Sequence, residues 1–199
     1  MKNWLEPVVL SGSNVDLIPL EKSHKDQLLE AASDGELWNL WYTSVPSKDK
    51  VEDYIHAALD EQKAGTSLPF VVVDKGSGKI IGSTRYCNVS SANKRVEIGY
   101  TWYSKSFQRT GVNTECKLLL LSHAFETLEV IAVAFMTNWH NHRSRNAILR
   151  LGAKQDGILR NHRLEPDGTI RDTVVFSIIR DEWKSVKKFL EFEVSRARN

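Results

Sequence analysis

The stretch Gln108-Arg109-Thr110-Gly111-Val112-Asn113-Thr114 decides the fold of this chain. It follows an apolar run, residues 96–103, that is typical of a strand, and it leads into helical spacing of apolar residues over 115–127. A loop between a strand and a helix N-terminus directs backbone N–H groups and the positive end of the helix dipole at one point. The loop therefore predicts a phosphate or pyrophosphate site, where Gly111 either takes a positive φ or lets the anion approach closely. An ordinary strand–turn–helix connection is the alternative.

Composition limits the class of protein. The 199 residues suffice for one domain, and 41% hydrophobic with 26% charged residues is typical of a soluble globular enzyme. The net charge of +2 is too small for a nucleic-acid binder, which concentrates basic residues on one face. Cys87 and Cys116 lack metal spacing, and the sequence shows neither a signal peptide nor an apolar run of membrane-spanning length. We expect a cytoplasmic protein with no nucleic acid and no membrane as partner.

The spacing of apolar residues predicts a fixed order of elements. Strands are expected at residues 15–20, 70–74, 80–88, 94–103, 130–136, 154–163 and 170–179, and helices at 24–32, 50–64, 115–127, 143–151 and 181–198. A type I turn at Glu165-Pro166-Asp167-Gly168 joins the last two strands, and Gly152 is expected just after the fourth helix. The order indicates one domain, 1–199, built around a central mixed sheet, with its core at 15–180 and a C-terminal helix at 181–198.

Two short patterns carry a resemblance. Gln108, Gly111 and Asn113 fit the pattern Gln/Arg-x-x-Gly-x-Gly/Ala, in which the last position is usually smaller than asparagine. A second pattern, an asparagine with a small residue three positions on and glycine eleven on, is formed by Asn141, Ser144 and Gly152. With the order of elements, these patterns resemble the GCN5-related N-acetyltransferase (GNAT) family over residues 15–179. The segments Glu97-Ile98-Gly99-Tyr100 and 141–147 are similar to its RimJ/RimL-like branch, the ribosomal-protein alanine acetyltransferases.

The resemblance implies an α/β (α+β) fold, the GNAT acyl-CoA N-acyltransferase fold. Its central mixed, mostly antiparallel seven-stranded sheet has flanking helices, and one strand splays from its neighbour. The implied activity is direct transfer of an acetyl group from acetyl-CoA to a primary amine in a ternary complex, without a metal. The amine belongs to a small molecule or a protein N-terminus. A catalytically silent acyl-CoA-binding module is the alternative, because Ile148 stands where many members carry a tyrosine general acid. A P-loop hydrolase is excluded, because Gly-x-x-x-x-Gly-Lys-Ser/Thr is absent.

For the coenzyme, the resemblance implies contacts from the splayed strand, the loop and the second pattern. The expected residues are Tyr100, Trp102, Tyr103, Gln108, Arg109, Thr110, Gly111, Val112, Asn113, Thr114, Asn141 and Arg145. Asn141 would bind the pantetheine amides or, alternatively, cap the helix that follows it. Arg143 or Arg145 would meet the 3′-phosphate. Arg109 stands where many members carry glycine, and it can add positive charge near the phosphates.

For the chemistry, Glu97 is the candidate general base, and its alternative is an ion pair with Lys94 or Arg95. An α-amino group, with a pKa near ~7.7, needs less help to lose its proton than a lysine near ~10.4. Ser144 is the candidate donor to the leaving thiolate, and its alternative is a hydroxyl that serves only the first turn of its helix.

Aromatic residues cluster between the first two helices. Trp38, Trp41 and Tyr42 either shape the acceptor pocket or belong to the core or a dimer contact, which leaves a homodimer open. His140 and His142 have no third ligand at a sensible spacing, so no metal site is predicted.

Overall fold

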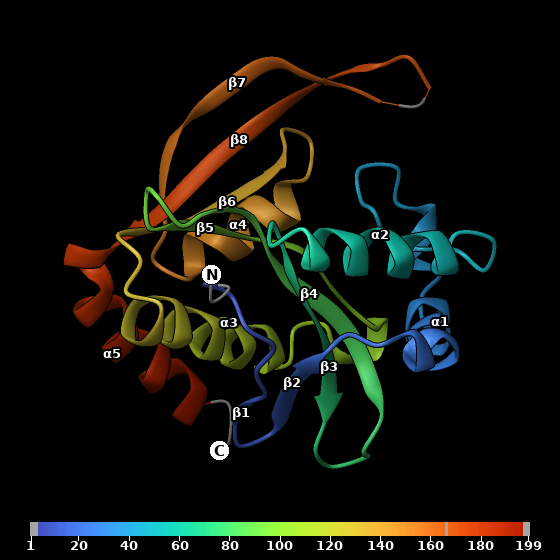
Figure 1. The fold of residues 1–199 in the computed structure, drawn as a ribbon, viewed down its shortest axis with the longest axis horizontal. Coiled ribbons are helices and arrows are strands. Elements are labelled where there is room, and N and C mark those ends of the chain that lie inside the picture. The colour runs from blue at the N-terminus through green and yellow to red at the C-terminus, as the bar shows by residue number, and fades with distance from the viewer. Residues whose placement is uncertain (1–3, 166, 197–199) are drawn as a thin grey trace.

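The computed structural model describes residues 4–165 and 167–196, and these form one eight-stranded sheet with helices on both faces (Figure 1). The strands are β1 (Leu10–Ser11), β2 (Val15–Pro19), β3 (Leu68–Asp74), β4 (Ile80–Ser90), β5 (Arg95–Tyr103), β6 (Ala132–Asn138), β7 (Lys154–Leu164) and β8 (Ile170–Ile179). The helices are α1 (Lys25–Ser33), α2 (Val51–Lys63), α3 (Val112–Ser122), α4 (His142–Arg150) and α5 (Arg180–Arg196). Among these residues, no helix is long and apolar enough to cross a membrane.

The strand order is β1-β2-β3-β4-β5-β6-β8-β7, and neighbours are antiparallel except β5 and β6, which are parallel. Alternate side chains of β3 enter two different cores, as the two faces of a pleated strand require. Phe70 lies in the main core, beneath α3 and α5, whereas Val71 lies in a second core beneath α1 and α2. Figure 1 shows α3 and α5 side by side, and the β7–β8 hairpin extending away from the rest of the sheet.

The predicted fold class and order of elements are confirmed, with differences at their ends. The two-residue strand β1 was not predicted, because so short a segment shows no alternation. Helix α3 begins at Val112 rather than at 115, inside the predicted anion loop, and it continues as a π-helix, His123–Thr127. Gly152 takes the expected positive φ of +91° after α4. The predicted turn keeps a hydrogen bond from the Gly168 N–H to the Glu165 carbonyl, while Pro166 and residues 197–198 lie outside the described residues.

Strand β5 is irregular at its centre. Ser83 pairs with Trp102 and Arg85 pairs with Gly99, so Thr84 of β4 faces two residues of β5, Tyr100 and Thr101. This is a β-bulge, and Tyr100 adopts a φ of +50°, in the left-handed region that aromatic residues rarely occupy. On its other edge, β5 pairs with β6 only through Arg95, Val96 and Glu97. Beyond Glu97 the two strands diverge, and this is the splay expected from the resemblance.

Candidate functional site

The predicted anion loop lies at the N-terminus of α3, where Gly111 is the N-cap. Among the residues that the structure describes, no side chain caps this helix, and Arg109, Thr110 and Gly111 are exposed. Because the first N–H groups of a helix have no partner within it, they are available to an anion from solvent. Gly111 has a φ of −26°, so of the two reasons considered for a glycine here, a positive φ does not apply, and close approach of the anion stays a prediction. Arg109, two residues earlier, takes the left-handed conformation instead, with a φ of +66°.

Gln108 ties the loop to both neighbouring elements. Its Nε2 donates to the Tyr103 carbonyl at 2.8 Å, at the end of β5, and its Oε1 accepts from the Arg143 guanidinium of α4. Arg143 therefore lies beside the loop. Arg145 is engaged elsewhere, since its Nη1 donates to the Trp139 carbonyl at 3.1 Å and its guanidinium lies 4.4 Å from the Trp139 ring centroid. The geometry thus favours Arg143 over Arg145 as a phosphate contact.

The remaining loop residues divide by burial. The Val112 side chain is buried in the main core, and the Thr110 hydroxyl donates to the Phe107 carbonyl at 2.8 Å. Asn113 and Thr114 are half-buried in the first turn of α3. The loop therefore offers an anion its backbone and its exposed Arg109 rather than a set of side-chain hydroxyls.

Asn141 caps α4, because its Oδ1 accepts the Ser144 N–H at 2.9 Å. This was the alternative role considered for it, and it occupies the oxygen that a pantetheine amide would need. Within residues 4–165 and 167–196, the Ser144 hydroxyl has no hydrogen-bond partner. Ser144 lies one turn before Ile148 on the same helix face, and Ile148 is buried in the main core.

Glu97 lies on β5 directly opposite Cys87 of β4, just before β5 and β6 diverge, and it is only 7% exposed. Its Oε2 accepts from the Asn88 amide at 2.7 Å. The alternative ion pair is not found in the part of the chain that the structure describes: Lys94 instead lies 3.9 Å from Glu129. Burial, followed by the Glu97 charge, raises the pKa of the Cys87 thiol, so this cysteine stays neutral. Glu97 is thus a buried carboxylate at the opening of the sheet.

The aromatic residues at the end of β5 are mostly enclosed. Trp102 is buried in the second core, and its Nε1 donates to the Tyr54 hydroxyl at 3.4 Å. Tyr103 is buried in the main core, where desolvation raises the pKa of its phenol. Tyr100 is 38% exposed. A ligand in the opening can therefore meet the backbone of this segment, whereas the Trp102 and Tyr103 side chains are committed to the cores.

Sequence reasoning missed two buried cations at the bulge. The Arg85 side chain is 2% exposed and its Nη1 lies 3.1 Å from the Glu61 carboxylate of α2. Lys117 of α3 is 4% exposed, and burial lowers its pKa to about 8. The signal available was a lysine among the apolar positions of a helix, since Lys117 stands between Cys116 and Leu118.

The predicted acceptor-pocket residues divide into two sets. Trp38 packs on the second core, whereas Trp41 is 66% exposed. The Trp41 ring lies 5.5 Å from the Tyr42 ring and 5.9 Å from the His140 ring, between centroids. The segment between α1 and α2 therefore meets the loop between β6 and α4 through exposed rings.

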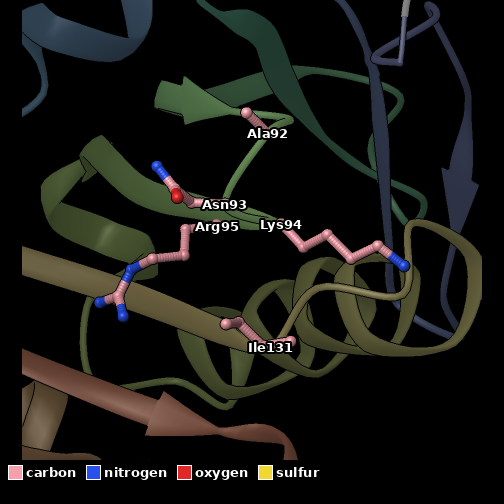
Figure 2. A pocket seen from close by; sticks show the side chains of 5 residues that line it. All are labelled: Ala92, Asn93, Lys94, Arg95 and Ile131. Atoms are coloured by element: carbon pink, nitrogen blue, oxygen red, sulfur yellow. The ribbon is translucent and has the colours of Figure 1, made fainter.

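A shallow hollow lies at the start of β5, at the opposite end of this strand from the anion loop. Figure 2 shows Lys94 and Arg95 pointing in opposite directions at its rim, and Ala92, Asn93 and Ile131 complete the lining. No group of three metal-ligating side chains occurs among the described residues.

Comparisons with known proteins agree with this geometry. The model of the acetyltransferase (GNAT) domain matches residues 14–154. The Bacillus subtilis (strain 168) protein YdaF, named for a proposed ribosomal N-acetyltransferase activity, is 33% identical over 110 residues. That match covers 55% of this chain and 59% of YdaF, so it spans little more than half of the relative.

Solved structures match over nearly the whole chain. A GCN5-related N-acetyltransferase from Brucella melitensis is 29% identical with a TM-score of 0.86, covering 96% of this chain and 86% of that one. A proposed acetyltransferase from T. thermophilus is 31% identical with a TM-score of 0.82, covering 95% and 98%.

Proposed function

This chain belongs to the GNAT acetyltransferase family, and from that premise we propose that it transfers the acetyl group of acetyl-CoA directly to a primary amine. The observation that carries the proposal is the juxtaposition of two features. Helix α3 begins with no side-chain cap from any described residue, and the sheet opens beside it, where β5 and β6 cease to pair after Glu97. An anion site next to exposed strand backbone suits a ligand with a pyrophosphate at one end and amides along its length.

The residues present fit acetyl-CoA. The first N–H groups of α3 would hold the pyrophosphate, with Arg109 and Arg143 adding positive charge beside them. The backbone of β5 after Glu97 would bond the pantetheine amides in the gap that β6 leaves. Asn141 is assigned no coenzyme contact, because its Oδ1 caps α4.

The reaction needs little covalent help from the protein. The amine nitrogen bonds to the thioester carbonyl carbon, the carbon–sulfur bond breaks, and the sulfur leaves as a thiolate. We assign Glu97 to accept the proton that the amine loses, directly or through water, because it is a carboxylate at the opening of the sheet. N–H groups in the segment from Tyr100 to Tyr103 would stabilise charge on the carbonyl oxygen, and Ser144 would donate to the thiolate.

The acceptor must be neutral when it attacks. An α-amino group near pKa ~7.7 meets this condition more readily than a lysine near ~10.4. The name of the B. subtilis relative points to a ribosomal protein. We therefore propose a protein N-terminus ahead of a small-molecule amine, entering beside Trp41 and His140.

Release of free thiol from acetyl-CoA tests this function against an acceptor panel. The panel holds a peptide with a free N-terminus, the same peptide blocked at its N-terminus and carrying one lysine, and a small-molecule amine. Calorimetry with coenzyme A runs alongside. Coenzyme binding without thiol release for any amine would indicate the silent binding module instead, and absence of coenzyme binding would overturn both readings.

Substitution of Glu97 by Gln tests the base. It keeps the shape and removes the proton acceptor, so kcat should fall roughly 10²-fold with little change in KM for acetyl-CoA. The loss should shrink as pH rises, because the amine then deprotonates without help. Glu129→Gln, which alters an exposed carboxylate beside Lys94, is the matched control. Wild-type kcat in Glu97→Gln at neutral pH would make Glu97 a structural residue.

A further inference from the structure

Buried cationic side chains contact the bulge in β5 from both faces of the sheet. On the α2 face, the Arg85 guanidinium lies 3.9 Å from the Tyr100 ring centroid and 5.1 Å from that of Tyr54. Its Nη1 lies 3.1 Å from the Glu61 carboxylate, which anchors it to α2. Arg85 thus positions Tyr100, the first residue of the bulge, by stacking on the tyrosine ring.

On the α3 face, the Lys117 ammonium donates to the Thr101 hydroxyl at 2.6 Å and to the Thr84 hydroxyl at 3.3 Å. These two hydroxyls are themselves 2.8 Å apart. Thr101 is the second residue of the bulge, and Thr84 is the residue of β4 that faces it. Lys117 therefore joins the two strands at the point where their register shifts.

Two features of the bulge cost folding free energy. A buried ammonium is costly unless it is paired with an opposite charge, and no salt bridge of the described residues involves Lys117. A non-glycine residue in left-handed geometry, such as Tyr100, costs on the order of 1–3 kcal/mol, and it persists only where its surroundings enforce it. Such costs concentrate at functional sites, and these lie beside the opening between β5 and β6.

We propose that Arg85 and Lys117 are positioning residues, which hold the Tyr100–Thr101 bulge so that the N–H groups of β5 point at the thioester carbonyl of acetyl-CoA. The proposal rests on the proposed function, because it takes the opening as the acetyl-CoA site. Loss of the bulge would shift the register by one residue and turn the following backbone and side chains. Because Arg85 contacts the bulge on one face of the sheet and Lys117 on the other, the bulge is held from both faces.

The test is the infrared stretch of the thioester carbonyl in acetyl-CoA labelled with carbon-13 at the carbonyl. Bound to the wild-type chain, the stretch should fall below its value in water, because preorganised N–H donors polarise the bond. This readout needs no acceptor, and a merely structural role would not move it. It is measured on Lys117→Met, Thr101→Val, Arg85→Met and Glu61→Gln.

The control is Ser67→Ala, which removes a buried hydroxyl bonded to the Tyr86 carbonyl at 2.8 Å, away from the bulge. Lys117→Met and Thr101→Val should each lose about half or more of the wild-type shift, and Ser67→Ala should keep all of it. Affinity for acetyl-CoA should stay within about threefold in every variant, because the anion loop is unchanged. If Arg85→Met fails to fold, Glu61→Gln tests the same face, since it weakens the anchor and leaves Arg85 in place.

The outcomes separate the two proposals. Folded Lys117→Met, Thr101→Val and Glu61→Gln that retain the full wild-type shift would overturn the positioning role. A wild-type complex whose carbonyl stretch equals that in water would also overturn it, while leaving acetyl-CoA binding intact. A wild-type chain that binds no acetyl-CoA would remove the proposed function, and the positioning role with it.

Discussion

Helices α3 and α4 border the proposed coenzyme site, and they begin in opposite ways. Gly111 starts α3, and no side chain in the described part of the chain caps it, so the first N–H groups are open to a ligand. Asn141 starts α4 and accepts the Ser144 N–H, so that N-terminus is satisfied within the protein. Both segments matched a family pattern in the sequence, yet only the open one can bind an anion through its backbone.

The contrast continues along the two helices. Helix α3 buries the Lys117 ammonium against the sheet, with no carboxylate partner among the described residues, whereas α4 buries Ile148 and leaves Arg143 and Arg150 exposed. Helix α4 is thus an ordinary amphipathic helix, and α3 departs from what stability alone would select. Sites of function are expected where local rules of stability are broken. We therefore expect different outcomes in the two helices. Substitutions in α3 should weaken coenzyme binding or increase the free energy of unfolding, whereas substitutions in α4 should change stability as in any capped helix.

The largest expected effect is that of Lys117→Met on stability. Lys117 has a pKa of about 8 in the folded chain, against ~10.4 when unfolded, so below pH 8 its charge destabilises the fold. The unfolded chain binds more protons between those values, and wild-type stability from this group rises with pH. At pH 7 the variant should therefore be more stable by up to about 3 kcal/mol, and the difference should shrink toward pH 10.

Urea unfolding of both proteins at pH 7 and pH 10 measures that difference. The two buried cysteines do not disturb the comparison, because burial raises the pKa of Cys116 to about 12 and raises that of Cys87, so both thiols stay neutral in the folded chain up to pH 10. A difference in unfolding free energy that is independent of pH would show that Lys117 is not charged and desolvated in the folded state.

The next effect is on coenzyme affinity at the open N-terminus. Gly111→Val places a branched side chain at the mouth of the anion loop, at a position whose φ is not in the left-handed region. Coenzyme A binding should weaken at least tenfold, about 1.4 kcal/mol, with the fold intact. Gly157→Val in β7 is the control, because a Cβ there meets nothing within 4 Å. Unchanged affinity in folded Gly111→Val would remove the loop from the coenzyme site.

Most of the fold was predictable because its elements carry long periodic patterns. The strands β7 and β8 and the helix α2 lie within two residues of their predicted bounds. Gly152 also behaved as predicted, because a glycine after the last turn of a helix is a local signal. The start of α3 was placed too late because residues 112–114 were assigned to the anion loop, although Val112 already packs in the main core with Cys116 one turn later.

The missed features depend on contacts between distant segments. Arg85 looks like an exposed strand residue until Glu61, 24 positions earlier, and the bulge in β5 are in place. The commitment of Arg145 to Trp139 depends on how the chain turns after β6, which periodicity does not reveal. The pattern at 108–113 located the anion loop, but it could not show that Arg109 rather than Gly111 takes the positive φ.

A smaller effect on rate is expected from Ser144→Ala in the closed helix. The Ser144 N–H, not its hydroxyl, takes part in the cap, so the melting temperature should be unaltered. If the free hydroxyl donates to the leaving thiolate, kcat should fall about tenfold, at the lower end of the effect of proton-transfer catalysis. Affinity for coenzyme A should be spared. Unaltered kcat would show that Ser144 has no chemical role. Of the two helices, only α3 would then take part in the proposed site through its N-terminus.

The smallest expected effect is that of Asn141→Ala, and it tests the contrast most directly. Loss of an N-cap side chain costs about 1 kcal/mol of stability, so the melting temperature should fall while coenzyme A affinity stays within about twofold. Asn141→Asp is the matched variant, because aspartate caps a helix as well as asparagine but lacks the amide donor. Normal stability and normal affinity in Asn141→Asp would assign the side chain to capping alone. Normal stability with weakened coenzyme binding would mean that the amide Nδ2 reaches the coenzyme while the Oδ1 caps the helix, and the N-terminus of α4 would then belong to the binding site as well.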